Sequence, residues 1–267
     1  MAIGVALLPR LSRAVHAKDK STAQNAMDEA VTFSLALTLP AAAALAAIPF
    51  FLIDGMYTRG QFTSFDAAQT GRALFFYGLG TPAFVLSQLY SRAFFARQDT
   101  RSPMKFALVS VAVNIVIGVT LVRIVGFQGI AAATAIAAWL NVGQMAWALG
   151  RKGHYLPSAH AWSRVIRITL ASLVLAGLLA VAQHFRPQIE AVFSGVHIGR
   201  RIVGAKEIAV LATVLIGALA YPPLLLAFGG LKMSEIKAAL RRQPKGPSLD
   251  EELEEDLGKT PAGPDLL

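Results

Sequence analysis

The chain has 267 residues, of which 55% are hydrophobic and only 15% are charged, with a formal net charge of +9. A soluble domain carries about 25% charged residues, so this composition disfavours an ordinary soluble protein. The absence of cysteine excludes a disulfide framework, thiol chemistry and cysteine-based zinc sites.

In chain order, a short apolar segment within residues 1–15 comes first. Its eight residues before Pro9 would rise only about 12 Å as a helix, which predicts a partial membrane span or an interfacial helix. Six runs without Asp, Glu, Lys or Arg follow, each near the roughly 20 residues that cross a bilayer. These runs are 30–53, 73–91, 106–122, 124–150, 168–185 and 208–231.

The six runs predict an all-α membrane protein, because they have almost no polar face to show to water. A large soluble protein with buried helices is the disfavoured alternative. We expect one helical lobe over 1–228, with Pro40 and Pro49 kinking its first complete span. Residues 229–267 predict a cytoplasmic tail, mostly disordered. The predicted spans are a partial one at 1–15 and six complete ones near 28–53, 70–92, 103–123, 129–150, 164–185 and 207–228.

Lys and Arg alternate in number from one connecting segment to the next. Of the 25 cations, 18 lie in one set of alternate segments, and 7 lie in the other set. Cytoplasmic loops collect Lys and Arg, so the segment 93–105 and the C-terminus are predicted to be cytoplasmic. Anionic phospholipid is the expected partner of these cations. Nucleic acid is not, because the cations are dispersed and no recognition motif accompanies them.

Chemistry-bearing motifs are scarce. The uncharged runs hold no carboxylate relay, and the sequence contains no P-loop, GxSxG or HExxH motif. We therefore predict neither an enzyme nor a metal site. The neutral polar residues of the spans suit hydrogen bonds between helices, or else a cavity lining or a cation site. Asn114 and Thr134, on consecutive antiparallel spans, are the candidate cation-site pair.

Two stretches resemble the MurJ/MviN lipid II flippases of bacterial cell-wall synthesis. One is YTRGQFTSFDAAQTGRALFFYGLGTPAFVLSQLYSRAFFARQDTRSP at 57–103, and the other is GVALLPRLSR at 4–13. The similarity runs from about residue 3 to the last span. It covers the second half of an architecture of fourteen helices in two lobes, which is shared with multidrug and oligosaccharide exporters.

The resemblance implies that the protein moves undecaprenyl-pyrophosphate-linked precursor to the outer leaflet of the bacterial inner membrane by alternating access. It implies a first lobe as partner, since the family's central cavity arginines belong there. It also implies a lipid groove between 165–185 and 207–228. Some members bind sodium, for which Asn114 and Thr134 could match, although Gly118 stands where an acidic partner would be. No cofactor is expected beyond coupling to sodium or to the membrane potential.

The substrate or gating candidates are Arg10, Arg92, Arg97, Asp99 and Arg101. Arg97 and Arg101 either anchor to lipid phosphate or pair with Asp99 and the other lobe to latch one state. Two further readings of the chain stay open. One is a non-transporting truncated fragment or assembly partner, and the other is a different lipid-oligosaccharide or drug exporter of the same superfamily.

Overall fold

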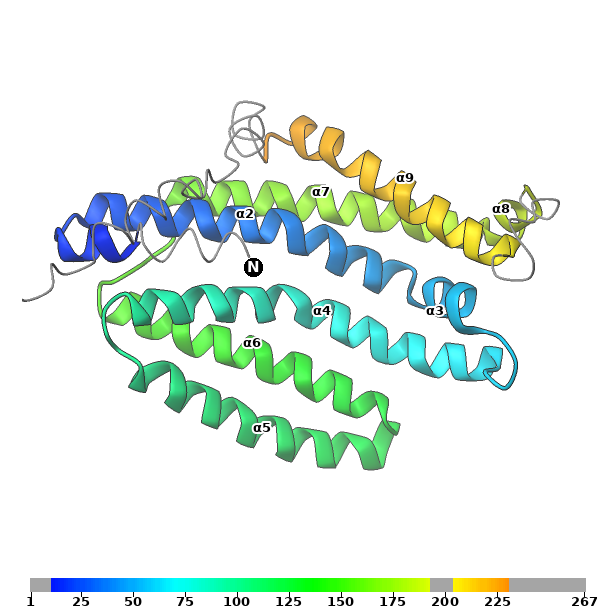
Figure 1. Cartoon of the computed structure of the whole chain (residues 1–267), viewed down its shortest axis with the longest axis horizontal. Coiled ribbons are helices and arrows are strands. Elements are labelled where there is room, and N and C mark those ends of the chain that lie inside the picture. Colours follow the sequence, from blue (N-terminus) through cyan, green and yellow to red (C-terminus); the bar gives the residue numbers. More distant parts are fainter. Residues whose placement is uncertain (1–10, 193–203, 231–267) are drawn as a thin grey trace, which may run out of the picture. The chain divides into compact units, whose positions relative to one another are not determined.

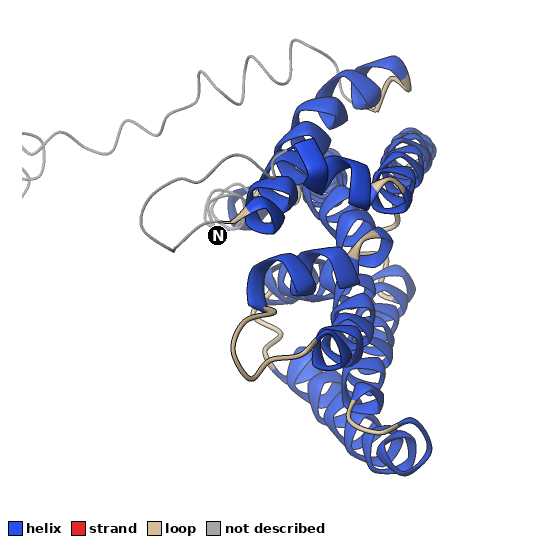
Figure 2. Ribbon diagram, turned by 90° about the vertical axis from the view of Figure 1, so that its right-hand side faces the viewer, coloured by secondary structure: helices blue, strands red, loops and turns tan. Residues whose placement is uncertain are grey.

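The computed structural model describes residues 11–192 and 204–230, and all regular structure in these ranges is helical (Figure 2). Arg10, the tail from 231 and the segment 193–203 lie outside the described residues. Residues 11–16 are helical. The further helices are α2 (Lys20–Ala47), α3 (Pro49–Tyr57), α4 (Ser64–Phe95), α5 (Arg101–Val125), α6 (Gln128–Arg151), α7 (Ala159–His184), α8 (Arg186–Val192) and α9 (Ala205–Ala227).

Side-chain caps set where several helices begin. The Asp19 carboxylate accepts hydrogen bonds from the backbone N–H groups of Ser21 and Thr22 at the start of α2. A separate hydrogen bond from the Thr22 hydroxyl has the largest effect on the Asp19 carboxyl, and together with the backbone bonds it lowers the pKa of Asp19 to about 2. Thr63 and Asp66 form a capping box at the start of α4. Such caps satisfy N–H groups that have no partner within the helix.

Proline separates α2 from α3. We expected one kinked helix over 28–53, but α2 ends at Ala47 and α3 begins at Pro49, while Pro40 is accommodated inside α2. Proline is favoured at the first helical position because it has no N–H to leave unpaired. Helix α3 continues to Tyr57 and α4 already begins at Ser64. The connection is therefore much shorter than the segment 54–69 that separates the predicted spans 28–53 and 70–92.

The long helices pack in the order α5, α6, α4, α2, α7, α9, each against the next (Figure 1). α4 has glycine where its neighbours come closest. A Cβ on Gly78 would lie 2.7 Å from the Cβ of Leu45 on α2, and a Cβ on Gly80 would lie 3.2 Å from Ala135 on α6. Small residues allow this close approach of membrane helices. α4 is thus held on both sides by protein.

Five of the described helices are long and apolar enough to cross a membrane: α2, α5, α6, α7 and α9. We expected six complete spans. The predicted span that is missing from these five, 70–92, lies in α4. This helix has 32 residues and is about as hydrophobic overall as α2, but it is not among the five. It lies between α2 and α6. By contrast, only 11% of the α5 span is buried in the protein.

Candidate functional site

The helices bring the charged residues to two ends of the bundle. At one end of the bundle, toward the left of Figure 1, α2, α5 and α7 begin and α4, α6 and α9 end. We call this the basic end. We call the end where α4, α6 and α9 begin the opposite end. Eleven described cations belong to the basic end, namely Arg13, Lys18, Lys20, Arg92, Arg97, Arg101, Lys105, Arg151, Lys152, Arg164 and Arg167. Five belong to the opposite end, namely Arg59, Arg72, Arg123, Arg186 and Lys206.

The linker between α6 and α7, residues 152–158, is tied to α2 at the basic end. The buried Tyr155 hydroxyl donates to the Asp28 carboxylate at 2.8 Å, and the Ser158 N–H donates to the same oxygen at 3.4 Å. Gln24 donates to the Leu156 carbonyl. Burial raises the pKa of Tyr155, and the Asp28 carboxylate raises it further. The hydroxyl therefore stays protonated and remains a donor.

Asp99 ties the α4–α5 connection to the end of α6. Its carboxylate accepts from the Lys152 ammonium at 2.7 Å and from the Ser102 hydroxyl at 2.7 Å. These two partners hold the pKa of Asp99 at about 2. His154 lies nearby, on the linker between α6 and α7. Burial and the charges of Arg97 and Lys152 lower its pKa. His154 is therefore neutral near pH 7.

The predicted arginines have different surroundings. Arg97 donates to the carbonyls of Ala93 at 2.7 Å and His154 at 3.1 Å rather than to the Asp99 carboxylate. Arg101 is exposed at the first position of α5. Arg92, in the last turn of α4, has one guanidinium nitrogen that is buried without a hydrogen-bond partner in the described part of the chain. Among the predicted site arginines that the structure describes, Arg92 is thus the one with a buried donor that has no partner.

The proposed cation pair is not joined by a hydrogen bond within the described residues. The Thr134 hydroxyl donates to the Ile130 carbonyl in its own helix at 2.8 Å. Gly118 of α5 lies against α6, because a Cβ on it would be 3.6 Å from the Cβ of Ala133. Asn114 lies one turn before Gly118 on the same helix. A cation site at these positions stays a prediction.

Other neutral polar residues bond from helix to helix. The Asn141 amide of α6 donates to the Ser87 hydroxyl of α4 at 2.7 Å, and Gln144 donates to Ser110 of α5 at 3.3 Å. Hydrogen bonds between membrane helices usually satisfy such side chains. For these four residues the structure favours a role in packing.

An apolar cavity of about 930 Å³ is lined by residues of α2, α4, α6 and α7. Its lining contains no charged side chain, and Ala, Gly, Leu, Ile, Phe, Trp and Pro make up all of it except Thr169 and Ser172. α6 and α7 are not neighbours in the packing order, so the row of helices curves around the cavity. The resemblance implied a groove between α7 and α9. The cavity shares α7 with that expectation, but its other walls come from α2, α4 and α6.

A buried ion cluster at the opposite end was not predicted. Asp54 of α3 is 3% exposed and pairs with Arg186 of α8, while Lys206 of α9 lies 3.3 Å from the same carboxylate oxygen. Burial raises the pKa of Asp54, but the bonds from Arg186 and Thr58 outweigh it and the pKa is lowered. The position of Asp54 just after an uncharged run was visible in the sequence. Its partners, 132 and 152 residues away, were not.

Known proteins resemble this chain in sequence and fold. The family model for "Lipid II flippase MurJ" matches residues 1–198. The probable lipid II flippase MurJ of Rhizobium meliloti (strain 1021) is 39% identical over 68% of this chain and 34% of its own length. That of Rhizobium tropici is 31% identical over 94% of this chain and 46% of its own length.

A solved structure named "Lipid II flippase MurJ, inward closed conformation" matches with a TM-score of 0.64 at 22% identity. The match covers 85% of this chain and 42% of the solved chain. It shows that the two folds are alike. The chain therefore spans less than half the length of these relatives. The predicted all-α membrane fold is confirmed, and so is the predicted resemblance. This chain is a multi-pass membrane protein that belongs to the MurJ lipid II flippase family.

Proposed function

We propose that this chain forms the second lobe of a lipid II flippase, which moves undecaprenyl-pyrophosphate-linked peptidoglycan precursor to the outer leaflet by alternating access. The observation that carries the proposal is the family match over residues 1–198. The activity is transport rather than catalysis, because moving a lipid between leaflets makes and breaks no covalent bond.

The apolar cavity supports a lipid substrate. Its volume of about 930 Å³ falls within the range of ligand pockets, and its uncharged lining suits a hydrocarbon chain. The basic end supplies arginines for a phosphate, with the buried nitrogen of Arg92 the donor without a partner among the described residues. Arginine suits phosphate because it offers paired donors and a fixed charge.

We further propose that transport requires a first lobe, on the same polypeptide or on another. Alternating access needs two bodies that rock about a shared site. A pyrophosphate within the hydrocarbon core also needs fixed cations there, since an uncompensated charge at that depth is costly. The uncharged runs of this chain contain none. The first lobe would supply them.

Complementation tests this proposal. The chain is expressed in bacteria depleted of their own flippase, first alone and then with a matching first lobe, and its amount in the membrane is measured in both cases. We expect growth only when both lobes are present. Growth with the chain alone would overturn the need for a first lobe. Failure of both, with both proteins in the membrane, would favour a non-transporting role.

The proposed location is the bacterial inner membrane, with the basic end and the C-terminus in the cytoplasm and anionic phospholipid against the basic end. Single cysteines test the orientation cleanly, because the chain has none. Gln98 and Gln61 are both exposed, and they lie in connections at the two different ends. An impermeant thiol reagent on intact spheroplasts should label Gln61→Cys and spare Gln98→Cys. The reverse pattern would invert the topology.

Asp99 distinguishes a latch from a lipid anchor. If the Asp99–Lys152 pair helps to hold one transport state, Asp99→Asn should change transport in the two-lobe protein without changing its amount in the membrane. Unaltered transport would leave only the anchoring role for the neighbouring arginines.

Coupling to sodium or to the membrane potential is proposed for the same two-lobe protein. Replacing sodium by N-methylglucamine tests the first, and collapsing the potential with valinomycin and potassium tests the second. Transport that persists under either treatment excludes the corresponding coupling.

A further inference from the structure

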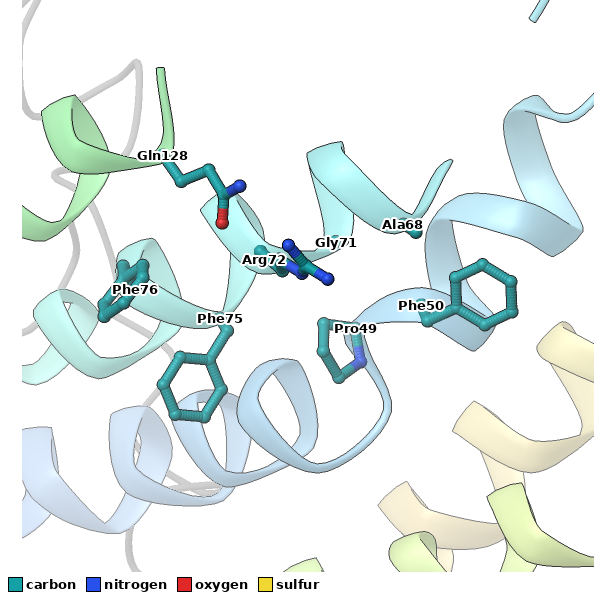
Figure 3. Close-up of a pocket in the computed structure, with 8 residues that line it drawn as sticks. All are labelled: Pro49, Phe50, Ala68, Gly71, Arg72, Phe75, Phe76 and Gln128. Carbon is teal, nitrogen blue, oxygen red and sulfur yellow. The ribbon is translucent and has the colours of Figure 1, made fainter. Parts of the chain in front are cut away.

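A second pocket, of about 450 Å³, lies at the opposite end between α3, α4 and the start of α6 (Figure 3). Its apolar walls include Pro49, Phe50, Phe75 and Phe76. The walls come together because Gly71 lets α4 lie directly against α3. A Cβ on Gly71 would be 3.2 Å from both the backbone nitrogen and the Cα of Phe50.

Arg72 gives this pocket its charge. It is the one charged residue in the lining, and in Figure 3 its guanidinium projects between Gln128 and Pro49. Within residues 11–192 and 204–230, Arg72 has no hydrogen-bond or ion-pair partner. Gln128 is held in place because its amide donates to Gln69 of α4 at 2.6 Å. The pocket thus combines apolar walls with one cation that is available to a ligand.

The neighbouring cations are already neutralised. Arg186 lies 5.3 Å from the ring centre of Phe50, but it is paired with Asp54 and with Glu190. Lys206 is paired with Asp54. These pairs fix the aromatic wall and leave the pocket a net charge of one.

The depth of Arg72 in the bilayer follows from the length of α4. Its 32 residues span about 48 Å, against a hydrocarbon core of about 30 Å. With the helix centred on the core, about 9 Å extends beyond each face. Arg72 comes eight residues after Ser64, about 12 Å along the helix, so its backbone lies just inside the hydrocarbon boundary. Arginine at this depth extends its guanidinium to the headgroups.

The pocket also borders the large apolar cavity. Phe76 lines both, so the two adjoin at its ring. A free phosphate ion would make no use of these apolar walls. A lipid would place its headgroup at Arg72 and a hydrocarbon chain along Phe76.

From this arrangement we propose that the pocket binds the headgroup of an anionic phospholipid, with Arg72 on the phosphodiester. A single cation matches the single negative charge of phosphatidylglycerol. A pyrophosphate carries more charge than one arginine compensates. The site needs only a membrane-inserted chain, so it stands or falls independently of the proposed transport.

Native mass spectrometry of the purified full chain tests the site. The protein is released from detergent in the presence of phosphatidylglycerol, phosphatidylcholine, undecaprenyl pyrophosphate or inorganic phosphate, and the retained adduct is quantified. We expect one phosphatidylglycerol to be retained in preference to the others. Arg72→Gln should weaken its retention by about tenfold, since it removes a charge-assisted bond to phosphate.

Arg123→Gln is the matched control. Arg123 is also exposed at the opposite end, in the last turn of α5, but it does not line the pocket. Retention should stay within twofold of the unmodified chain in this variant, and Arg72→Lys should keep part of it. Equal losses in the Arg72→Gln and Arg123→Gln variants, or none in either, would overturn the site. Stronger retention of undecaprenyl pyrophosphate or of inorganic phosphate would overturn the assignment to a phospholipid.

Discussion

The Asp54–Arg186 pair offers a sharp test of how the opposite end is held together. Both side chains are largely buried, at 3% and 14% exposure, and they join α3 to α8. Asp54→Ala leaves the guanidinium without its main partner. Losing one member of a buried ion pair costs about 3–5 kcal/mol of unfolding free energy. We expect about 3 kcal/mol, because Glu190 remains within 2.6 Å of Arg186 and Lys206 is 46% exposed to water.

A double-mutant cycle separates the pair itself from the cost of an orphaned charge. Arg186→Met alone leaves Asp54 buried with only Lys206 and Thr58 as partners. The double variant removes both charges, and replacing a whole buried pair by apolar residues is often close to neutral. We therefore expect the double variant to be about 2 kcal/mol more stable than the sum of the single effects predicts.

The assay is the free energy of unfolding in mixed micelles, obtained by titration with dodecyl sulfate and followed by circular dichroism. Arg59→Gln is the control, since the Arg59–Glu207 pair at the same end is more exposed, at 53% and 21%. That change should cost less than about 1 kcal/mol. Single effects at Asp54 and Arg186 that add within about 0.5 kcal/mol would refute a coupled buried pair.

The same titration tests three further expectations. Gly129→Ala would place a Cβ 2.6 Å from backbone of α5 and should cost about 1–3 kcal/mol, whereas Gly143→Ala, with nothing within 4 Å, should not destabilise. Because the Lys152 ammonium holds the folded pKa of Asp99 near 2, below its ordinary 3.8, the stability from this pair should be complete above about pH 5 and be lost as the pH falls toward 2. Asp99→Asn should remove that part of the pH dependence, and an unchanged profile would contradict the pairing. Tyr155→Phe removes a hydrogen bond to a carboxylate and should cost about 1.5–3 kcal/mol, with no effect if the linker is not tied to α2.

Composition and the spacing of charges predicted a helix well where its formation depends only on its own residues. The uncharged run 106–122 lies inside α5, and the run 124–150 contains nearly all of α6. A stretch without charges favours a membrane helix whatever its neighbours are. The same reasoning placed 93–105 beside other basic segments, because charged ends stay at the membrane surface. The break at Pro49 was only half predicted, as a kink rather than the start of a new helix.

The partners of the charged side chains could not be predicted in this way. Asp99 pairs with Lys152, 53 residues along the chain, and Asp54 pairs with Arg186, 132 residues along. Sequence alone offers several cations at each end as partners for each carboxylate. Packing of α6 beside α4, and of α8 near α3, selects one of them.

The membrane character and the all-α fold were thus readable from the order of residues, because hydrophobicity and charge act over one helix at a time. The position of the apolar cavity was not, since its walls come from four helices that meet only after folding. The place of α4 between α2 and α6 was likewise decided only by packing. Contacts between segments far apart in the chain depend on how whole helices pack, and no local pattern of residues specifies that.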